Sequence, residues 1–284
     1  MTKHAILQVV SGPEVFKKLT LAPGGRVRVG RGEGADLVLP DPSIGRVEFE
    51  IDWDGTYVEA RTRPTTQGNV LLSGVPVSQA PVPHGAWIHA GATDFMVYYE
   101  GHTPPRVEPN GDPVRLASVT QALATLEELA EGRILYAVLD PARDERILVL
   151  LKEAIEEHRS LYEGIKGLAL ADVAPYLVRF EPGSRLLRAL VEEGWGEAWG
   201  IYFTSPNGPK AVRRHLRRFL MVEEEESRDR LYLRFYDPRV LRDFLPLANA
   251  RQKSEVFEEI DRFFCEGPRF ELLSFDAATK KGAG

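Results

Sequence analysis

The sequence has a single cysteine, Cys265, among 284 residues, and it has no long hydrophobic run. One cysteine excludes an internal disulfide and is typical of proteins from a reducing compartment. The residues after Met1 are polar and are followed only by a short apolar stretch at 5–10, which does not resemble a signal peptide. Because a membrane span needs about 20 consecutive apolar residues, we expect no membrane partner and a cytoplasmic location.

The sequence also lacks an excess of positive charge and the common catalytic motifs. Its formal net charge is −6, which argues against nonspecific binding to nucleic acid. Neither a phosphate-binding G-x-x-x-x-G-K-[ST] loop nor a G-x-S-x-G nucleophile elbow is present, and the six histidines show no metal-ligand spacing. Cys265 follows two phenylalanines, a context that favours a small buried hydrophobic residue over a nucleophile. We therefore expect no enzymatic activity, no cofactor and no metal.

Residues 1–100 show short apolar stretches separated by Gly, Pro, Asp and Ser. Many short strands at this spacing predict an all-β sandwich. The expected strands are residues 6–10, 26–29, 36–39, 47–51, 57–61, 68–72, 86–89 and 94–99.

Residues 101–115 are rich in proline and polar residues and have no hydrophobic period, which predicts a linker. From residue 116 to residue 284, helical and strand patterns alternate, which predicts an α/β domain that folds separately. The expected helices are 118–131, 144–158, 184–193 and 209–221, and the expected strands are 134–139, 176–180 and 198–204. The fold class is therefore a multidomain protein with an N-terminal all-β sandwich and a C-terminal α/β domain.

The segment 231–241 combines a strand pattern with a helix start. Leu231, Leu233 and Phe235 alternate with polar or aromatic residues, and Asp237-Pro238 then provides a cap and a first helical residue. Arg234, Asp237 and Arg239 meet at this corner, where a carboxylate can be held between two guanidiniums. The corner is either a structural clasp or a protein-binding site.

This corner also carries a family resemblance. Arg234-Phe-Tyr-Asp-Pro-Arg-Val-Leu241 resembles a motif of the type VI secretion adaptor family, and five further motifs follow the family order between residues 135 and 266. These motifs are Leu135-Tyr-Ala-Val-Leu-Asp140, Ser160-Leu-Tyr-Glu-Gly164, Ala174-Pro-Tyr-Leu-Val178, Trp195-Gly-Glu-Ala-Trp-Gly-Ile-Tyr-Phe203 and Arg213-Arg-His-Leu-Arg-Arg218. The resemblance implies a cytoplasmic chaperone, encoded beside the VgrG spike protein, that binds a cognate effector and loads it onto VgrG.

Two groups of residues are candidates for contacting these partners. Arg213, Arg214, Arg217 and Arg218 lie along one side of the predicted helix 209–221, either as a solvated face or as a docking face for an acidic segment. Trp195 and Trp199 flank glycines at a strand entrance and are either core residues or interface anchors. Under the adaptor reading, apolar contacts supply affinity and the Arg234–Asp237–Arg239 corner sets the register.

The N-terminal half resembles a forkhead-associated domain through Gly30-Arg31, the segment 35–41 and Ser43-Ile-Gly-Arg46. The resemblance implies a phosphothreonine pocket in which Arg31 and Arg46 keep the two basic positions. Gly45 replaces the family's serine, Glu48 replaces its histidine, and Thr65, Thr66 and Gln67 replace residues of its Asn-Gly loop. Because phosphate donors are missing, we expect a degenerate pocket and a protein-binding scaffold.

The alternative function is a signalling module in which the first half reads phosphothreonine to regulate secretion. The two functions differ in the ligand that they require. An adaptor binds unphosphorylated effector, whereas the signalling module requires a phosphothreonine peptide.

Overall fold

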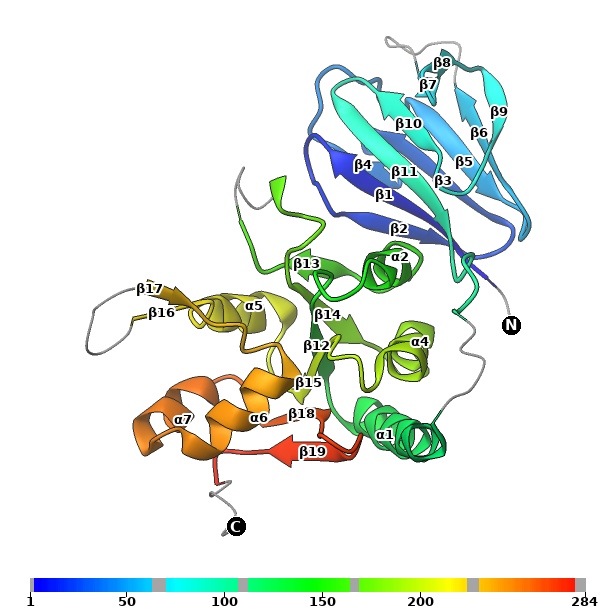
Figure 1. Cartoon of the computed structure of the whole chain (residues 1–284). Helices are drawn as coiled ribbons and strands as arrows, with labels where there is room; N and C mark the ends of the chain where they lie inside the picture. The colour runs from blue at the N-terminus through cyan, green and yellow to red at the C-terminus, as the bar shows by residue number, and fades with distance from the viewer. Residues whose placement is uncertain (1–2, 63–69, 107–111, 164–168, 224–229, 279–284) are drawn as a thin grey trace. The chain divides into compact units, whose positions relative to one another are not determined.

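The computed structural model describes residues 3–62, 70–106, 112–163, 169–223 and 230–278 (Figure 1). Contacts divide the chain into two compact units. Unit 1 consists of Met1–Pro104 and Lys152–Glu157, and unit 2 consists of Pro105–Leu151 and His158–Gly284. Residues 152–157, which lie within the expected C-terminal domain, thus pack with the N-terminal unit.

Unit 1 is a sandwich of two sheets. The first has the strand order β2-β1-β11-β10-β7-β8 and the second β4-β3-β5-β6-β9, with every pairing antiparallel except β3 with β4. The strands are β1 (Ala5–Ser11), β2 (Lys18–Leu21), β3 (Gly25–Gly30), β4 (Leu37–Val38), β5 (Phe49–Trp53), β6 (Val58–Thr62), β7 (Leu71–Leu72), β8 (Val75–Pro76), β9 (Gln79–Val82), β10 (Trp87–Ala90) and β11 (Thr93–Tyr99).

The core of unit 1 lies between these two sheets. Phe49, Ile51 and Trp53 alternate with partly exposed residues along β5 and point into the core, where Phe49 meets Phe95 edge-on at 5.4 Å. The predicted alternation is therefore correct for this strand. Strands β2, β8 and β9 were not predicted, because they are only two to four residues long and two of them contain proline.

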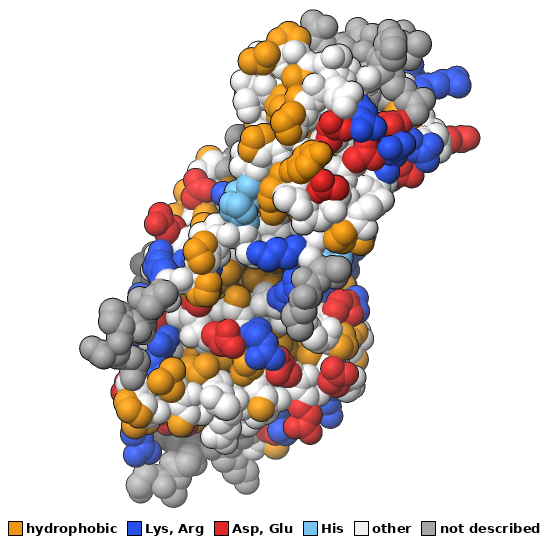
Figure 2. Space-filling view, turned by 90° about the vertical axis from the view of Figure 1, so that its right-hand side faces the viewer, with side chains coloured by type: hydrophobic (Ala, Val, Ile, Leu, Met, Phe, Trp, Pro, Cys, Tyr) orange, Lys and Arg blue, Asp and Glu red, His pale blue; other side chains and the backbone are white. Residues whose placement is uncertain are grey.

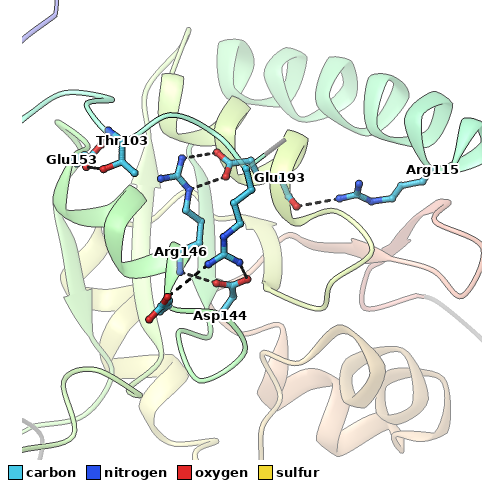
Figure 3. A network of polar contacts seen from close by, with 8 residues as sticks. Thr103, Arg115, Asp144, Arg146, Glu153 and Glu193 are labelled. Atoms are coloured by element: carbon cyan, nitrogen blue, oxygen red, sulfur yellow. Dashed lines mark hydrogen bonds and ion pairs between the residues drawn. The ribbon is translucent and has the colours of Figure 1, made fainter. Parts of the chain in front are cut away.

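The segment 152–157 is held in unit 1 by polar contacts. The Lys18 ammonium donates to the carbonyl oxygens of Ala154 and Glu156 at 2.6 and 3.1 Å. The buried carboxylate of Glu153 accepts from the Thr103 backbone N–H at 2.8 Å and from the Thr103 hydroxyl (Figure 3). If one partner of a buried hydrogen bond is removed, the other is left buried without a partner, which costs free energy. These contacts therefore hold the segment 152–157 in unit 1.

Unit 2 contains a six-stranded antiparallel sheet with the order β13-β14-β12-β15-β18-β19 and a two-stranded ribbon, β16-β17. Its strands are β12 (Leu135–Leu139), β13 (His158–Ser160), β14 (Tyr176–Phe180), β15 (Gly200–Thr204), β16 (Met221–Glu223), β17 (Arg230–Tyr232), β18 (Arg262–Glu266) and β19 (Leu272–Phe275). Its helices are α1 (Pro113–Gly132), α2 (Arg146–Lys152), α4 (Arg185–Gly194), α5 (Pro209–Arg217), α6 (Pro238–Leu247) and α7 (Ala250–Val256).

Helices cover both faces of this sheet. Figure 1 shows α1, α2 and α4 on one side of the central strands and α5, α6 and α7 on the other. All five residues of β12 are buried, which explains its uninterrupted apolar run. Tyr136 and Val138 of β12 join the same core cluster as Leu216 of α5 and Leu241 of α6. The expected combination of a β-sandwich with a domain of helices and strands is therefore confirmed.

Two expected elements of unit 2 differ from the structure. The helix predicted at 144–158 ends at Lys152, and residues 158–160 instead form β13, which pairs with Tyr176–Val178 of β14. The strand predicted through Tyr236 ends at Tyr232, and Phe235 and Tyr236 lie in a turn before α6. At residues 158–160, pairing with β14 overrides the local helical pattern.

Helix α1 begins within the expected linker. Asp112 caps it by accepting from the Val114 N–H at 2.9 Å, and Pro113 takes the first helical position. Within the described residues, none of the helices combines the length and the apolar character that crossing a bilayer requires.

Candidate protein-binding surfaces

An apolar groove of about 550 Å³ opens on the side of unit 2 that carries α5, α6 and α7. Phe219 follows α5, Leu233 follows β17, Phe244 lies on α6 and Val256 ends α7. Phe219, Leu233 and Phe244 are only partly buried, so their apolar surfaces remain accessible. Such a groove is the kind of surface that takes apolar side chains of a polypeptide.

Local sequence signals position the helices around this groove. Asp237 caps α6 and Pro238 follows as its first residue, as predicted. Asn249 and Gln252 form a capping box at the start of α7, each side chain accepting from the other's backbone N–H at 2.9 Å. Helix α5 buries Val212 and Leu216 on the face toward the core.

The charged groups at the rim of the groove are already paired. Arg218 contacts the Glu258 carboxylate at 2.5 Å, and Arg251 contacts Glu255 at 2.9 Å. Beneath them, His215 is bonded through Nε2 to the Val256 carbonyl at 2.9 Å. Burial and the nearby Arg218 charge lower the pKa of His215, although the hydrogen bond to the Val256 carbonyl acts in the opposite direction. Because the pKa is lowered overall, the imidazole is neutral near pH 7. The groove therefore presents mainly apolar surface to a partner.

The predicted basic face of α5 is largely engaged within unit 2. Arg213 donates to the Ser160 carbonyl at 2.7 Å and contacts Glu163 at 2.6 Å, and Arg217 donates to the Leu161 carbonyl at 2.9 Å and contacts Glu163 at 2.6 Å. These two arginines therefore clamp the segment 160–163 against α5. Of the four arginines, only Arg214 is exposed without a contact among the described residues, so neither a fully solvated face nor a free docking face describes the whole set.

Trp195 and Trp199 lie in the core and are not exposed anchors. Their exposed fractions are 2% and 6%, and the Trp195 indole N–H donates to the Phe270 carbonyl at 2.7 Å. A Cβ atom added at Gly194 would lie 2.3 Å from the Trp199 ring, so this glycine is required for the ring to pack. Of the two readings that the sequence left open, the structure supports the core role.

The corner at 234–239 contains two separate ion pairs. Asp237 is held bidentately by Arg239, with Nε–Oδ1 and Nη2–Oδ2 distances of 2.9 and 2.5 Å. Arg234 instead contacts Asp140, which follows β12 and is fully buried. The expected single carboxylate between two guanidiniums is therefore wrong, because a second carboxylate 94 residues away takes Arg234.

A further ion pair in unit 2 was not predicted. Arg146 of α2 holds Glu193 of α4 through Nε–Oε2 and Nη2–Oε1 contacts of 2.8 and 3.0 Å, and both side chains are at least nine-tenths buried (Figure 3). Arg115 of α1 donates to the Trp195 and Glu193 carbonyls at 2.7 and 3.1 Å. These contacts connect α1, α2 and α4, and in the sequence each arginine looks like any other charge on a helix.

The side of unit 2 that carries α1 and α4 has a mixed surface. Figure 2 shows acidic, basic and apolar side chains interspersed there. Arg188 and Glu127, one on each helix, contact each other at 2.5 Å. Exposed pairs of this kind contribute about 0–1 kcal/mol, so this face is ordinary protein surface.

In unit 1, the loops expected to form a phosphate pocket bring Arg31 and Arg46 to one end of the sandwich. The Gly32 N–H donates to the Arg46 carbonyl at 3.0 Å, and both arginine side chains are exposed. Glu48 turns inward and accepts from the Gly45 N–H at 2.6 Å. Thr65, Thr66 and Gln67 lie outside the described residues.

The single cysteine is buried, as its apolar sequence context predicts. Cys265 is 0% exposed, and burial raises the pKa of its thiol to about 12, so the reactive thiolate is not formed near pH 7. Across the part of the chain that the structure describes, His, Cys, Asp and Glu do not form a group of three or more that could hold a metal.

The N-terminal region is similar to several solved structures. The forkhead-associated domain of CT664 from Chlamydia trachomatis is 22% identical, with a TM-score of 0.32 over 34% of this chain and 96% of that one. The forkhead-associated domain of an Arabidopsis thaliana protein is 22% identical, with a TM-score of 0.32 over 38% and 92%. The cytoplasmic domain of the type III secretion sorting platform protein PscD from P. aeruginosa is 22% identical, with a TM-score of 0.31 over 38% and 94%.

The C-terminal region matches a protein family. Residues 135–255 fit the model described as "Domain of unknown function (DUF4123)", and no curated protein matched the chain. This segment includes the Arg234–Asp140 pair and all the groove residues except Val256. Residues 135–255 are therefore similar to the DUF4123 family, and this match covers all six motifs that resemble the type VI secretion adaptor family.

Proposed function

We propose that this protein is a cytoplasmic type VI secretion adaptor that binds a cognate effector and loads it onto the VgrG spike protein, acting by binding and not by catalysis. The observation that carries the proposal is the family match over residues 135–255, which contain nearly the whole lining of the apolar groove.

We propose that the groove holds an apolar segment of the effector. Phe219, Leu233 and Phe244 expose apolar surface, and the rim charges on Arg218 and Glu255 are satisfied by Glu258 and Arg251. An apolar segment can cover this lining without leaving a charge unpaired, whereas a strongly charged segment has no counterpart there.

The test fills or charges the groove in the full chain. Glu255→Trp places an indole at the rim without removing a core contact, and Phe244→Glu buries a charge in the lining. We expect each variant to reduce, by about tenfold or more, the binding of the effector encoded by a neighbouring gene, since groove anchors contribute 2 kcal/mol or more, about thirtyfold. Leu247→Glu is the matched control, because Leu247 lies on the same helix but is 67% exposed and outside the groove.

Binding is measured by co-expression with each neighbouring gene product, and folding of each variant by circular dichroism. A folded Glu255→Trp variant that retains full effector binding would contradict the groove assignment. If no neighbouring gene product binds the unsubstituted chain, the adaptor function itself is wrong.

The second candidate function is phosphothreonine binding by unit 1. It rests on the position of Arg31 and Arg46 in neighbouring loops at one end of the sandwich. Calorimetric titration with phosphothreonine peptides distinguishes the two functions. We expect weak or no binding, and a low-micromolar complex abolished by Arg31→Ala would favour the signalling function.

A further inference from the structure

Three arginines and a tyrosine form an exposed surface on unit 2 that the groove does not include. We call Arg143, Tyr232, Arg234 and Arg239 the arginine–tyrosine face. Tyr232 is 42% exposed, the side chains of Arg234 and Arg239 are 40% and 50% exposed, and Arg143 is also exposed. Arginine and tyrosine are enriched at the energetically important centres of protein interfaces.

Contacts within unit 2 hold three of the four side chains of this face, those of Tyr232, Arg234 and Arg239. Asp140 and Asp237, with exposed fractions of 0% and 3%, anchor Arg234 and Arg239. The Tyr232 hydroxyl is bonded to that of Tyr236 at 2.8 Å, and the Tyr236 ring lies under the Arg234 guanidinium at 5.9 Å. Side chains that are ordered before binding lose little conformational entropy on binding, so Tyr232, Arg234 and Arg239 are preorganised.

The positive and negative groups at this corner differ in their exposure to solvent. Arg143 lies in the turn after Asp140, and its charge lowers the pKa of Asp237. Its side chain has no contact within the described residues. With Arg242, four guanidiniums interact with four carboxylates at this corner, those of Asp140, Asp237, Glu266 and Glu197. Asp140, Asp237 and Glu266 are buried, whereas Glu197 and the three arginines of the face are exposed. A partner therefore meets three exposed guanidiniums and one exposed carboxylate.

We propose that the arginine–tyrosine face docks an acidic segment of a protein partner, with a carboxylate of that segment bound between Arg143 and the outer N–H groups of Arg239 and Arg234. Guanidinium N–H groups and carboxylate oxygens form charge-assisted hydrogen bonds, and an adjacent tyrosine supplies apolar contact. This site is separate from the apolar groove, because Leu233 lines the groove whereas its neighbours Tyr232 and Arg234 belong to the face.

The test uses the full chain and fluorescein-labelled hexaglutamate as the probe, with binding measured by fluorescence anisotropy. We expect saturable binding, with labelled hexaglutamine bound at least about tenfold more weakly. Arg143→Glu is the informative variant, since its side chain has no internal contact to lose, and we expect it to weaken hexaglutamate binding about fivefold or more.

Lys210→Glu is the matched control, with the same change of charge. Lys210 is exposed near the start of α5. Asn207, three residues before it, accepts from the Tyr136 hydroxyl near the start of β12, whereas Asp140 follows the end of that strand. We expect this variant to bind hexaglutamate within about twofold of the unsubstituted chain.

Three results would overturn the proposal. These are equal binding of hexaglutamine, equal weakening by Lys210→Glu and Arg143→Glu, and displacement of the probe by inorganic phosphate with an affinity equal to that of hexaglutamate at matched ionic strength. The experiment needs no effector, so its outcome is independent of the proposed adaptor function.

Discussion

Gly45 and Glu48 in unit 1 stand where the forkhead-associated family has a serine and a histidine, and they contact each other. Glu48 is fully buried, and its carboxylate accepts from the Gly45 N–H at 2.6 Å. A Cβ atom at Gly45 would lie 2.9 Å from Glu48 Oε2. The glycine and the glutamate are therefore coupled, and a serine at position 45 cannot be added without moving the buried carboxylate.

We predict that Gly45→Ser lowers the free energy of unfolding of unit 1 by about 1–3 kcal/mol, the usual cost of overpacking a buried site. Gly34→Ser in the same loop region is the control, because a Cβ atom there would meet only Val47 Cγ2 at 3.9 Å. Thermal unfolding by calorimetry measures both. Equal stability of the two variants would show that the Glu48 carboxylate moves freely, contrary to this coupling.

At the scale of elements, helix α6 depends on its first residues. Asp237 accepts from the Arg239 backbone N–H at 2.9 Å and from its guanidinium. Burial acts to raise the pKa of Asp237, but these hydrogen bonds and the Arg239 and Arg143 charges outweigh burial and lower it. Because the folded pKa is depressed, the charged carboxylate stabilises the protein above the unfolded pKa of about 3.9, and this stability is lost as pH falls through the folded value.

We predict that Asp237→Ala lowers stability at pH 7 by about 1–2 kcal/mol through loss of the cap. Asp237→Asn keeps a capping oxygen and loses only the ion pair, which costs about 1 kcal/mol because Arg239 is half exposed. Urea unfolding between pH 7 and pH 3 measures the difference. The gap between the Asn variant and the unsubstituted chain should begin to close as pH falls below about 4, and a gap independent of pH would contradict the ion-pair contribution.

At the scale of the whole molecule, unit 1 is built from two separate stretches of chain. Residues 152–157 belong to it although the sequence on both sides belongs to unit 2. Lys18, which donates to the Ala154 and Glu156 carbonyls, is 8% exposed, and burial lowers its pKa to about 7 despite the opposing charges of Glu156 and Glu157. Neither half of the chain therefore contains a complete unit 1.

We predict that a fragment of residues 116–284 loses hydrogen-exchange protection at 152–157 by about tenfold or more, because its partners in 1–104 are removed. Helix α4 (Arg185–Gly194), which lies wholly in unit 2, serves as the internal control and should keep its protection. Equal protection of 152–157 in the fragment and in the full chain would show that this segment is fixed without unit 1.

Much of the fold follows from local sequence. The alternation in β5, the Ser184 cap of α4 and the Asp237-Pro238 start of α6 were all predictable, because caps and strand faces depend on residues within a few positions. The family resemblance of residues 135–255 was likewise visible in the sequence, because it rests on the order of short motifs along the chain.

The partners of the charged residues were decided only by the tertiary structure. Arg234 pairs with Asp140 and Arg146 pairs with Glu193, although other carboxylates lie closer to each arginine in the sequence. The groove likewise requires α5, α6, α7 and Leu233 to converge. Local sequence determines which residues are charged or apolar. Ion pairs and grooves depend on how close distant segments of the chain lie, and only the folded structure brings those segments together.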